Sequence, residues 1–408
     1  MEAAFLAKRL GNFLNAPKLF QQMSWESRQR KRAAKQRSGK TKFLWILPFV
    51  VVACAAARFF VWQKHSAQVE TKTAVAVIAT NVVIQPTIFK YPKNLAELCA
   101  MKTNDLAQCD IAWMNLLCAE GLPGAENLNP VASMQLLDSW TELVRRTTEK
   151  NFYRFRENPA EFDNSEVIYR MMILSMVLKR DLGVKYNPQF RDLPLAWGAG
   201  DLEFFSDSKN CFLHGVLSPE KVGTCGTLPV LECAIGRRLG YPLKLVRAKR
   251  HCFIRWESPD GKIRQNIESA GDGFGYHSDE YYRTWPEVIT DEEVQRGDYL
   301  KSLSPAEELA MFLGQRGLVL MTQRYVWLSL DTLVTAHKFA PNDNLIRQAM
   351  AYYATTIDQN EADFKADMQQ KLEQVHDQQN PLAEADFVSD YQRTLLLIER
   401  LKHDLNNP

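Results

Sequence analysis

The stretch of the chain that most restricts its fold is a change of hydrophobic period around Pro242. Before it, apolar residues recur at helical spacing from Leu228 to Leu239, and a Gly-Tyr-Pro sequence ends the pattern. After it, apolar and polar side chains alternate through residues 243–256, which is typical of a β-strand. A second alternating run follows at residues 263–268, after the turn sequence Ser-Pro-Asp-Gly. This order predicts a helix followed by an antiparallel pair of strands.

Chemically reactive side chains occur at the ends of these elements. Cys225 stands between two glycines where the helix is expected to begin, so its thiol would lie near unpaired backbone N–H groups and the positive end of the helix dipole. Both favour a thiolate, and the same N–H groups can stabilise an oxyanion. His251 falls on the first strand and Glu268 on the second. A thiol, an imidazole and a carboxylate in this order indicate a nucleophile, a base and a group that orients the base.

Residues 200–290 resemble the core of the transglutaminase-like superfamily of papain-like cysteine enzymes. Members carry a Gly-x-Cys helix start, a His on the following strand and an Asp, Asn or Glu on the strand after it, and Cys225, His251 and Glu268 stand at those positions. The third position is usually Asp, and Asn266 is the second candidate for it. The resemblance implies an α+β fold, in which the helix that bears the Cys packs on an antiparallel sheet, and catalysis by these three residues.

The turn between the two strands decides whether Glu268 shares a sheet face with His251. A four-residue loop places the two residues directly opposite each other, and a two-residue loop makes them diagonal neighbours with Ala270 opposite His251. A three-residue loop with a bulge would instead put Cys252 opposite Glu268. The family resemblance favours the even loops, in which Asn266 lies on the same face but farther along the strand.

The other cysteines and histidines of this stretch fit structural roles. Cys233, on the helix, and Cys252, on the strand face opposite His251, are expected to be buried, because a free Cys behaves as a small apolar side chain. His214 and His277 lie in loop-like sequence and are expected at the surface. None of these four residues is expected to react.

The cysteine pattern also limits the choice of cofactors. Eight cysteines occur without Cys-x-x-Cys pairs or Cys/His ligand spacing, so neither a metal nor a cofactor is expected. Eight are too few for a disulfide scaffold in a chain of 408 residues. Three of them are close enough in sequence for a bridge outside the cytoplasm: Cys99, Cys109 and Cys118.

The composition is that of an ordinary globular protein. Apolar residues make up 46% and charged residues 24%, and 408 residues suffice for two or three domains with a proper core. A formal net charge of +2 argues against nucleic-acid binding by the chain as a whole, so no nucleic-acid partner is expected. The basic residues are unevenly spread, and a dense group of them lies near the N-terminus.

An apolar run at residues 43–62 has the length of a membrane-spanning helix, with tryptophans near both ends. The strongly basic segment 28–42 precedes it. By the positive-inside rule, residues 1–42 are expected to form a cytoplasmic tail, and everything after the run to lie outside the cytoplasm, in the periplasm if the source is bacterial. Two processing alternatives are cleavage at residues 55–57 and lipidation of Cys54. The apolar sequence beyond both sites favours an uncleaved, single-pass anchor in the cell membrane.

Helical sequence precedes the expected catalytic core. Residues 63–92 form a linker with β-like alternation, ended by two prolines. The expected catalytic domain, residues 93–290, opens with apolar residues at helical spacing, which predicts three helices. They are expected at residues 95–120, 130–150 and 165–182.

The C-terminal region, residues 291–408, is expected to be all-helical. Ser304 begins a capping box with a proline at the first helical position, which predicts a helix to about residue 321. Helices at 324–339 and from residue 344 onward resemble a tetratricopeptide-type hairpin, which would offer a groove to a protein partner. An ordinary helical bundle packed on the catalytic domain is the alternative.

Two functions are consistent with these features. The first is a membrane-anchored, transglutaminase-like cysteine peptidase or acyltransferase, in which Cys225 attacks the carbonyl of a peptide or isopeptide bond in a protein or peptide substrate. His251 would shuttle the proton, and Glu268 would orient the imidazole. The second is a scaffold of the same fold that has lost catalysis and binds a partner through its helical region. The presence of all three reactive groups favours the enzyme.

Overall fold

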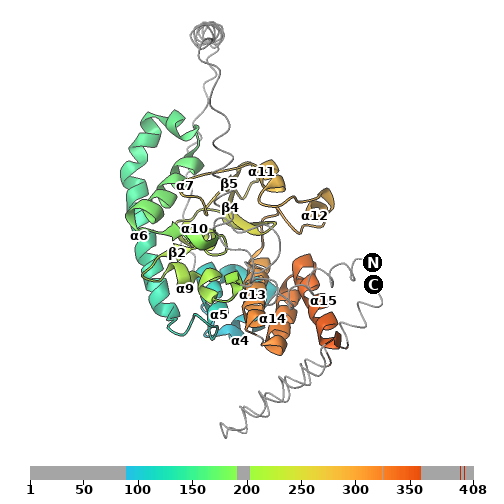
Figure 1. Cartoon of the computed structure of the whole chain (residues 1–408). Helices are drawn as coiled ribbons and strands as arrows, with labels where there is room; N and C mark the ends of the chain where they lie inside the picture. Colours follow the sequence, from blue (N-terminus) through green and yellow to red (C-terminus); the bar gives the residue numbers. More distant parts are fainter. Residues whose placement is uncertain (1–88, 191–202, 324, 360–395, 397–398, 400–408) are drawn as a thin grey trace, which may run out of the picture. The chain divides into compact units, whose positions relative to one another are not determined.

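The computed structural model describes the greater part of the chain beyond residue 88. All of this part belongs to one compact unit, which mixes α-helices with two small β-sheets (Figure 1). The mixture of helix and sheet expected from the sequence is therefore confirmed at this coarse level. The described parts are residues 89–190, 203–323, 325–359, 396 and 399.

The N-terminal predictions fall on residues 1–88, which lie outside the described residues. They concern the basic tail, the membrane-spanning helix at 43–62 and nearly all of the linker. Among the helices of the described parts, none combines the length and the apolar character needed to cross a bilayer. The expected anchor therefore stays a prediction.

The first expected helix, at residues 95–120, is wrong as a single element. The segment instead forms three short helices, and a polar side chain begins the third. Asp110 accepts hydrogen bonds from the backbone N–H groups of Ala112 (2.8 Å) and Trp113 (3.2 Å) and so caps the third. The three are α4 (Leu95–Ala100), the 3₁₀-helix η2 (Thr103–Gln108) and α5 (Ile111–Ala119).

The next two expected helices are present. Asn129 caps the long helix α6 (Pro130–Glu157), which continues beyond its expected end at residue 150. The 3₁₀-helix η3 (Pro159–Phe162) connects it to α7 (Glu166–Met176), which passes directly into the π-helical segment η4 (Val177–Asp181).

A short parallel pair of strands leads to the cysteine. Strand β1 (Lys185–Tyr186) pairs with β2 (Val222–Gly223), so two segments 37 residues apart lie side by side immediately before Cys225. The described residues between the strands include the short helices η5 (Pro188–Phe190), η6 (Ser208–Asn210) and α9 (Leu213–Val216).

Helix α10 (Leu228–Arg238) is the helix predicted from the apolar spacing. Pro229 lies in its first turn, as expected. Gly240, with φ of +78°, follows its end and turns the chain toward the sheet. A glycine is also needed at position 236 within the helix. A Cβ atom there would lie 2.3 Å from Cδ1 of Leu243, so the absence of a side chain at Gly236 lets the following strand pack close to the helix.

The main sheet has three antiparallel strands in the order β3-β4-β5. The prediction of one strand across residues 243–256 is wrong, because the chain reverses at Lys249 and Arg250 and forms two strands that pair with each other. Arg250 adopts the left-handed φ of +61°, and the turn contains none of the residues that usually announce one. The strands are β3 (Leu243–Ala248), β4 (His251–Glu257) and β5 (Arg264–Ile267).

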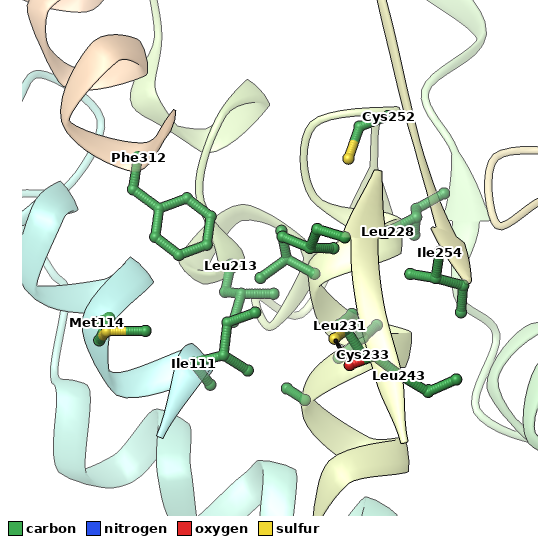
Figure 2. Close-up of a cluster of buried hydrophobic side chains, with 14 of the residues drawn as sticks. Ile111, Met114, Leu213, Leu228, Leu231, Cys233, Leu243, Cys252, Ile254 and Phe312 are labelled. Atoms are coloured by element: carbon green, nitrogen blue, oxygen red, sulfur yellow. Dashed lines mark hydrogen bonds between the residues drawn. The ribbon is translucent and has the colours of Figure 1, made fainter. Parts of the chain in front are cut away.

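The core lies around α10. In Figure 2, Leu228 and Leu231 of this helix lie between side chains of the helices that precede it in the chain and side chains of the sheet. Phe312 of α13 (Pro305–Thr322) joins the cluster on the side away from the sheet. Burial of these apolar surfaces fixes the helix that follows Cys225 between two layers. The cluster also contains Ile111, Met114, Leu213, Cys233, Leu243, Cys252 and Ile254.

The described part of the C-terminal region is helical, as predicted. Ser304 and Glu307 form the expected capping box at the start of α13. Arg247 of β3 forms an ion pair with Asp343 (2.7 Å), whose carboxylate also caps the helix that follows it by accepting from the N–H of Leu345. Helix α11 (Asp279–Thr284) precedes this region, and the other helices described within it are α12 (Asp291–Gln295), α14 (Val326–Phe339) and α15 (Asn344–Gln359).

One arginine, fully buried on β4, connects the sheet to the segments that follow it. Arg255 is 0% exposed, and its guanidinium donates to Asn266 (2.7 Å), Asp279 (2.7 Å) and the carbonyl of Leu300 (3.0 Å). Asn266 also donates to Asp279 (2.7 Å). A buried charge is tolerated only with such partners, so this network fixes the start of α11 against the sheet.

We expect Arg255→Met to lower the free energy of unfolding by about 3 kcal/mol, because it leaves buried acceptors without their donor. Arg264→Met is the matched control: Arg264 also pairs with Asp279 (2.9 Å), but it is 49% exposed. Its loss is expected to cost less than about 1 kcal/mol. Urea denaturation of both variants and the original chain measures the difference. Equal losses in the two variants would contradict the prediction.

Candidate active site

Cys225 lies in a tight turn directly before α10. The N–H of Leu228 donates to the carbonyl of Thr224 (2.9 Å), so the turn continues into the helix, which begins three residues after the cysteine. The hydroxyl of Thr224 stabilises the turn: it donates to the carbonyl of Asn210 (2.6 Å) and accepts from the N–H of Gly226 (3.0 Å). The thiol is therefore held on a rigid, partly exposed turn.

The pairing of β4 with β5 decides which face Glu268 occupies. Ile254 pairs with Ile267 and Arg255 with Asn266, and continuing this register places Ala270 opposite His251. This is the register expected from the two-residue loop, in which Glu268 is the diagonal neighbour of His251. The bulged alternative is excluded.

The carboxylate of Glu268 is buried and accepts hydrogen bonds from three donors. His251 Nε2 lies 2.9 Å from Oε2, the hydroxyl of Tyr282 donates to the same oxygen (2.8 Å), and the N–H of Ala270 donates to Oε1 (2.7 Å). Burial would raise the pKa of Glu268, but the hydrogen bond and charge of His251, together with the other two donors, hold this pKa below its usual value. The carboxylate is therefore ionised while it faces the imidazole.

His251 connects this carboxylate to the thiol. Its ring hydrogen-bonds Glu268 through Nε2 and also hydrogen-bonds the side chain of Cys225. Burial alone would lower the pKa of His251, but these two hydrogen bonds and the adjacent charges raise it to about 9. At neutral pH the ring is therefore an imidazolium between two groups that can carry negative charge.

Tyr186 also contacts Cys225. Strand pairing places it opposite Gly223, and its phenol hydrogen-bonds both the side chain and the backbone N–H of Cys225. Burial, followed by the influence of Cys225, raises the pKa of Tyr186 above its usual value, so the phenol stays protonated at neutral pH and can donate. The sulfur thus contacts both an imidazolium and a phenol.

Aromatic rings border the imidazole away from the cysteine. The ring of Trp285 meets that of His251 edge-on, with centroids 4.8 Å apart, and is 40% exposed. Tyr281 lies next to Trp285 (5.4 Å), and His277 stacks on Tyr281 (4.0 Å). These rings partly shield the imidazole from water on this side.

Asn266, the second candidate for the third position, does not contact the histidine. Its side chain instead accepts from Arg255 and donates to Asp279 and to the carbonyl of His277. These contacts give it a structural role in the network around Arg255, and Glu268 is the residue that hydrogen-bonds the imidazole.

The remaining cysteines are free thiols in the described part of the chain, including Cys99, Cys109 and Cys118. Cys233 and Cys252 are buried in the core, as predicted. Within the same residues no group of three His, Cys, Asp or Glu side chains has the geometry to hold a metal ion.

The two histidines predicted at the surface are only partly exposed. His214 lies half-buried on α9, where burial lowers its pKa to about 4. His277 is half-buried against Tyr281. Both are covered by tertiary packing, which the loop-like composition around them does not reveal.

Comparison with known proteins finds no matching protein-family model, no matching curated protein and no matching solved structure. The transglutaminase-like resemblance and the catalytic roles of Cys225, His251 and Glu268 therefore stay predictions, supported by the geometry of the site.

Three aromatic residues of the site were not predicted from the sequence: Tyr186, Tyr282 and Trp285. The last two lie in the conspicuous aromatic run at residues 281–285, whereas Tyr186 gives no local signal.

We expect iodoacetamide to modify Cys225 at least about tenfold faster than Cys99 at neutral pH, because an imidazolium contacts only the first of these thiols. Cys99 is a matched control: both thiols are partly exposed, but burial raises the pKa of Cys99 to about 11. Mass spectrometry of the modified peptides measures both rates. The advantage of Cys225 should disappear in His251→Ala, and its persistence there would contradict the assignment of the base.

The raised pKa of His251 also predicts how stability depends on pH. Since it is raised from 6.5 to about 9 on folding, the stabilising effect is fully present below pH 6.5 and is lost as the pH rises through 9. The difference in free energy of unfolding between the original chain and His251→Gln should thus shrink between pH 6.5 and 9. Urea denaturation at several pH values tests this, and a difference that stays constant would contradict it.

Proposed function

We propose that this protein is a membrane-anchored, transglutaminase-like cysteine enzyme that acts on peptide or isopeptide bonds. The observation that carries the proposal is the hydrogen-bonded series from the thiol of Cys225 through His251 to the carboxylate of Glu268. The proposed fold is supported by the packing of α10 on the antiparallel sheet. Membrane attachment is supported by the apolar run at residues 43–62 and the basic segment before it.

In the first step, the thiolate of Cys225 adds to the substrate carbonyl, and a carbon–sulfur bond forms while the carbonyl oxygen becomes an oxyanion. His251, held as an imidazolium by Glu268, donates a proton to the leaving amine as the carbon–nitrogen bond breaks. The products of this step are a thioester on Cys225, a free amine and a neutral imidazole.

Two donors are suitable for the oxyanion. The backbone N–H of Cys225 and the hydroxyl of Tyr186 lie beside the sulfur, where they hydrogen-bond each other. Donors fixed in advance at this position stabilise the charge that develops in the transition state. A bound substrate would place its carbonyl oxygen between them and so replace their mutual hydrogen bond.

In the second step, the neutral imidazole of His251 takes a proton from the acceptor as the acceptor attacks the thioester. Water as acceptor gives a carboxylic acid, and a primary amine gives a new amide; in both cases the carbon–sulfur bond breaks and the thiolate of Cys225 and the imidazolium of His251 are restored. The substrate is a protein or peptide in both cases. A non-catalytic scaffold would not require these three groups to be aligned, which favours the enzyme.

The C-terminal helices are the proposed place for a protein partner. Helices α14 and α15 are neighbours that pack against each other, which is consistent with the resemblance to a tetratricopeptide-type hairpin. This binding role is separate from the chemistry of Cys225 and does not depend on it.

The central test uses a library of peptides with carboxamide and isopeptide groups, with and without an added primary amine. Mass spectrometry is expected to detect hydrolysis or amide exchange with the original chain, and neither with Cys225→Ala. Tyr186→Phe should lower turnover about 10-fold to 100-fold through loss of an oxyanion donor, without unfolding. Glu268→Gln should lower turnover more than it lowers stability. Reaction by the original chain and Cys225→Ala at equal rates would refute the proposed nucleophile.

A further inference from the structure

The proposed mechanism gives no role to the buried carboxyl group of Glu232. Glu232 is 2% exposed and lies in the second turn of α10, the helix that follows Cys225. Carboxyl groups are rarely buried unless they are paired. Its Oε2 accepts a hydrogen bond from the hydroxyl of Ser269 (2.8 Å), which is itself 0% exposed. This contact is a hydrogen bond from a neutral hydroxyl, so it is not an ion pair.

The position of Ser269 makes this contact relevant to the active site. Ser269 directly follows Glu268, so the hydrogen bond ties α10 to the end of β5 that presents the carboxylate to His251. A buried polar contact thus connects α10, the helix that follows Cys225, to the segment that carries Glu268.

Two charged side chains act on Glu232. Lys179 belongs to the π-helical segment η4 and favours the ionised form, while Glu268 opposes it. The ammonium of Lys179 also donates to the carbonyl of Gly273 (2.6 Å), so it is held by the loop after β5. Burial and Glu268 together outweigh Lys179 and Ser269, and they raise the pKa of Glu232 to about 7.

We propose that Glu232 is a positioning residue of this active site, a second buried acid that acts through Glu268 and Ser269 on the protonation of His251. The proposal rests on the proposed function for its catalytic meaning, but the coupling itself is a property of the fold. Glu232 is near enough to Glu268 for their charges to interact, so an ionised Glu232 adds negative charge near the imidazolium and favours it. When Glu232 is protonated, the imidazolium loses this support.

The coupling has a consequence for the reaction. Proton donation to the leaving amine needs the imidazolium, so an ionised Glu232 extends the reaction to higher pH. Removing the charge should move the alkaline limit of activity toward neutrality without altering the thiol, the imidazole or the orienting carboxylate.

The test is an NMR titration of the full-length chain labelled with ¹⁵N-histidine, with the His251 signal assigned by its absence in His251→Gln. In Glu232→Gln, which keeps an oxygen for Ser269, the pKa of His251 should fall by about half a unit or more. Glu308→Gln is the matched control, because Glu308 is also buried and contacts α10, yet it pairs with Arg237 (2.5 Å). It should leave the titration of His251 unchanged.

Three results would overturn the proposal. They are an unchanged His251 titration in Glu232→Gln, an equal shift in Glu308→Gln, and a His251 signal in the original chain that does not respond to the ionisation of Glu232, which ¹³C NMR of its carboxyl group follows in the same samples. The last measurement needs no variant, so it holds even if a substitution disturbs folding. None of the three depends on turnover. Failure of the coupling can therefore be told apart from failure of the enzyme proposal, which the peptide library tests separately.

Discussion

The burial of the Glu268 carboxylate is the constraint on which the candidate site depends. A carboxylate removed from water is stable only where donors replace its hydration, and here they come from three separate places: the imidazole of His251, the hydroxyl of Tyr282 and the backbone of Ala270. Each donor fixes one segment, namely the start of β4, helix α11 and the chain after β5. The imidazole is therefore oriented by the same contacts that make the buried charge tolerable.

The donors need support of their own, and Arg255 provides part of it. Its guanidinium connects β4 to Asp279 at the start of α11, and this helix carries Tyr282. The ring of Tyr282 also stacks on Phe253 of β4 (3.8 Å), between His251 and Arg255 on the same strand face. A buried polar network and an aromatic contact thus place the hydroxyl at the carboxylate, so changes at Arg255 should reach the site through α11.

The sequence predicts the parts of this site that are set by local rules. Helix α10 follows from its apolar spacing, and the facing of Glu268 and His251 follows from strand parity once the turn is even. The parts it does not predict depend on tertiary contacts. The reversal at Lys249 and Arg250 contains no Gly, Pro, Asn or Asp, and Tyr186 reaches Cys225 through a two-residue strand whose partner lies 37 residues away.

Both apolar packing and a hydrogen bond hold α10 against the sheet, and they restrain the helix in different ways. Apolar packing, such as the approach of Leu243 to Gly236, favours contact but tolerates small sliding, because dispersion and burial have little direction. A hydrogen bond is directional, so the contact between Ser269 and Glu232 restricts sliding of the helix past β5. Cys225 lies at one end of this helix, and the distance of its thiol from the imidazole varies with any such sliding. A buried acid is an unfavourable choice for a tether unless its charge has a use, since a neutral side chain could accept the same hydrogen bond.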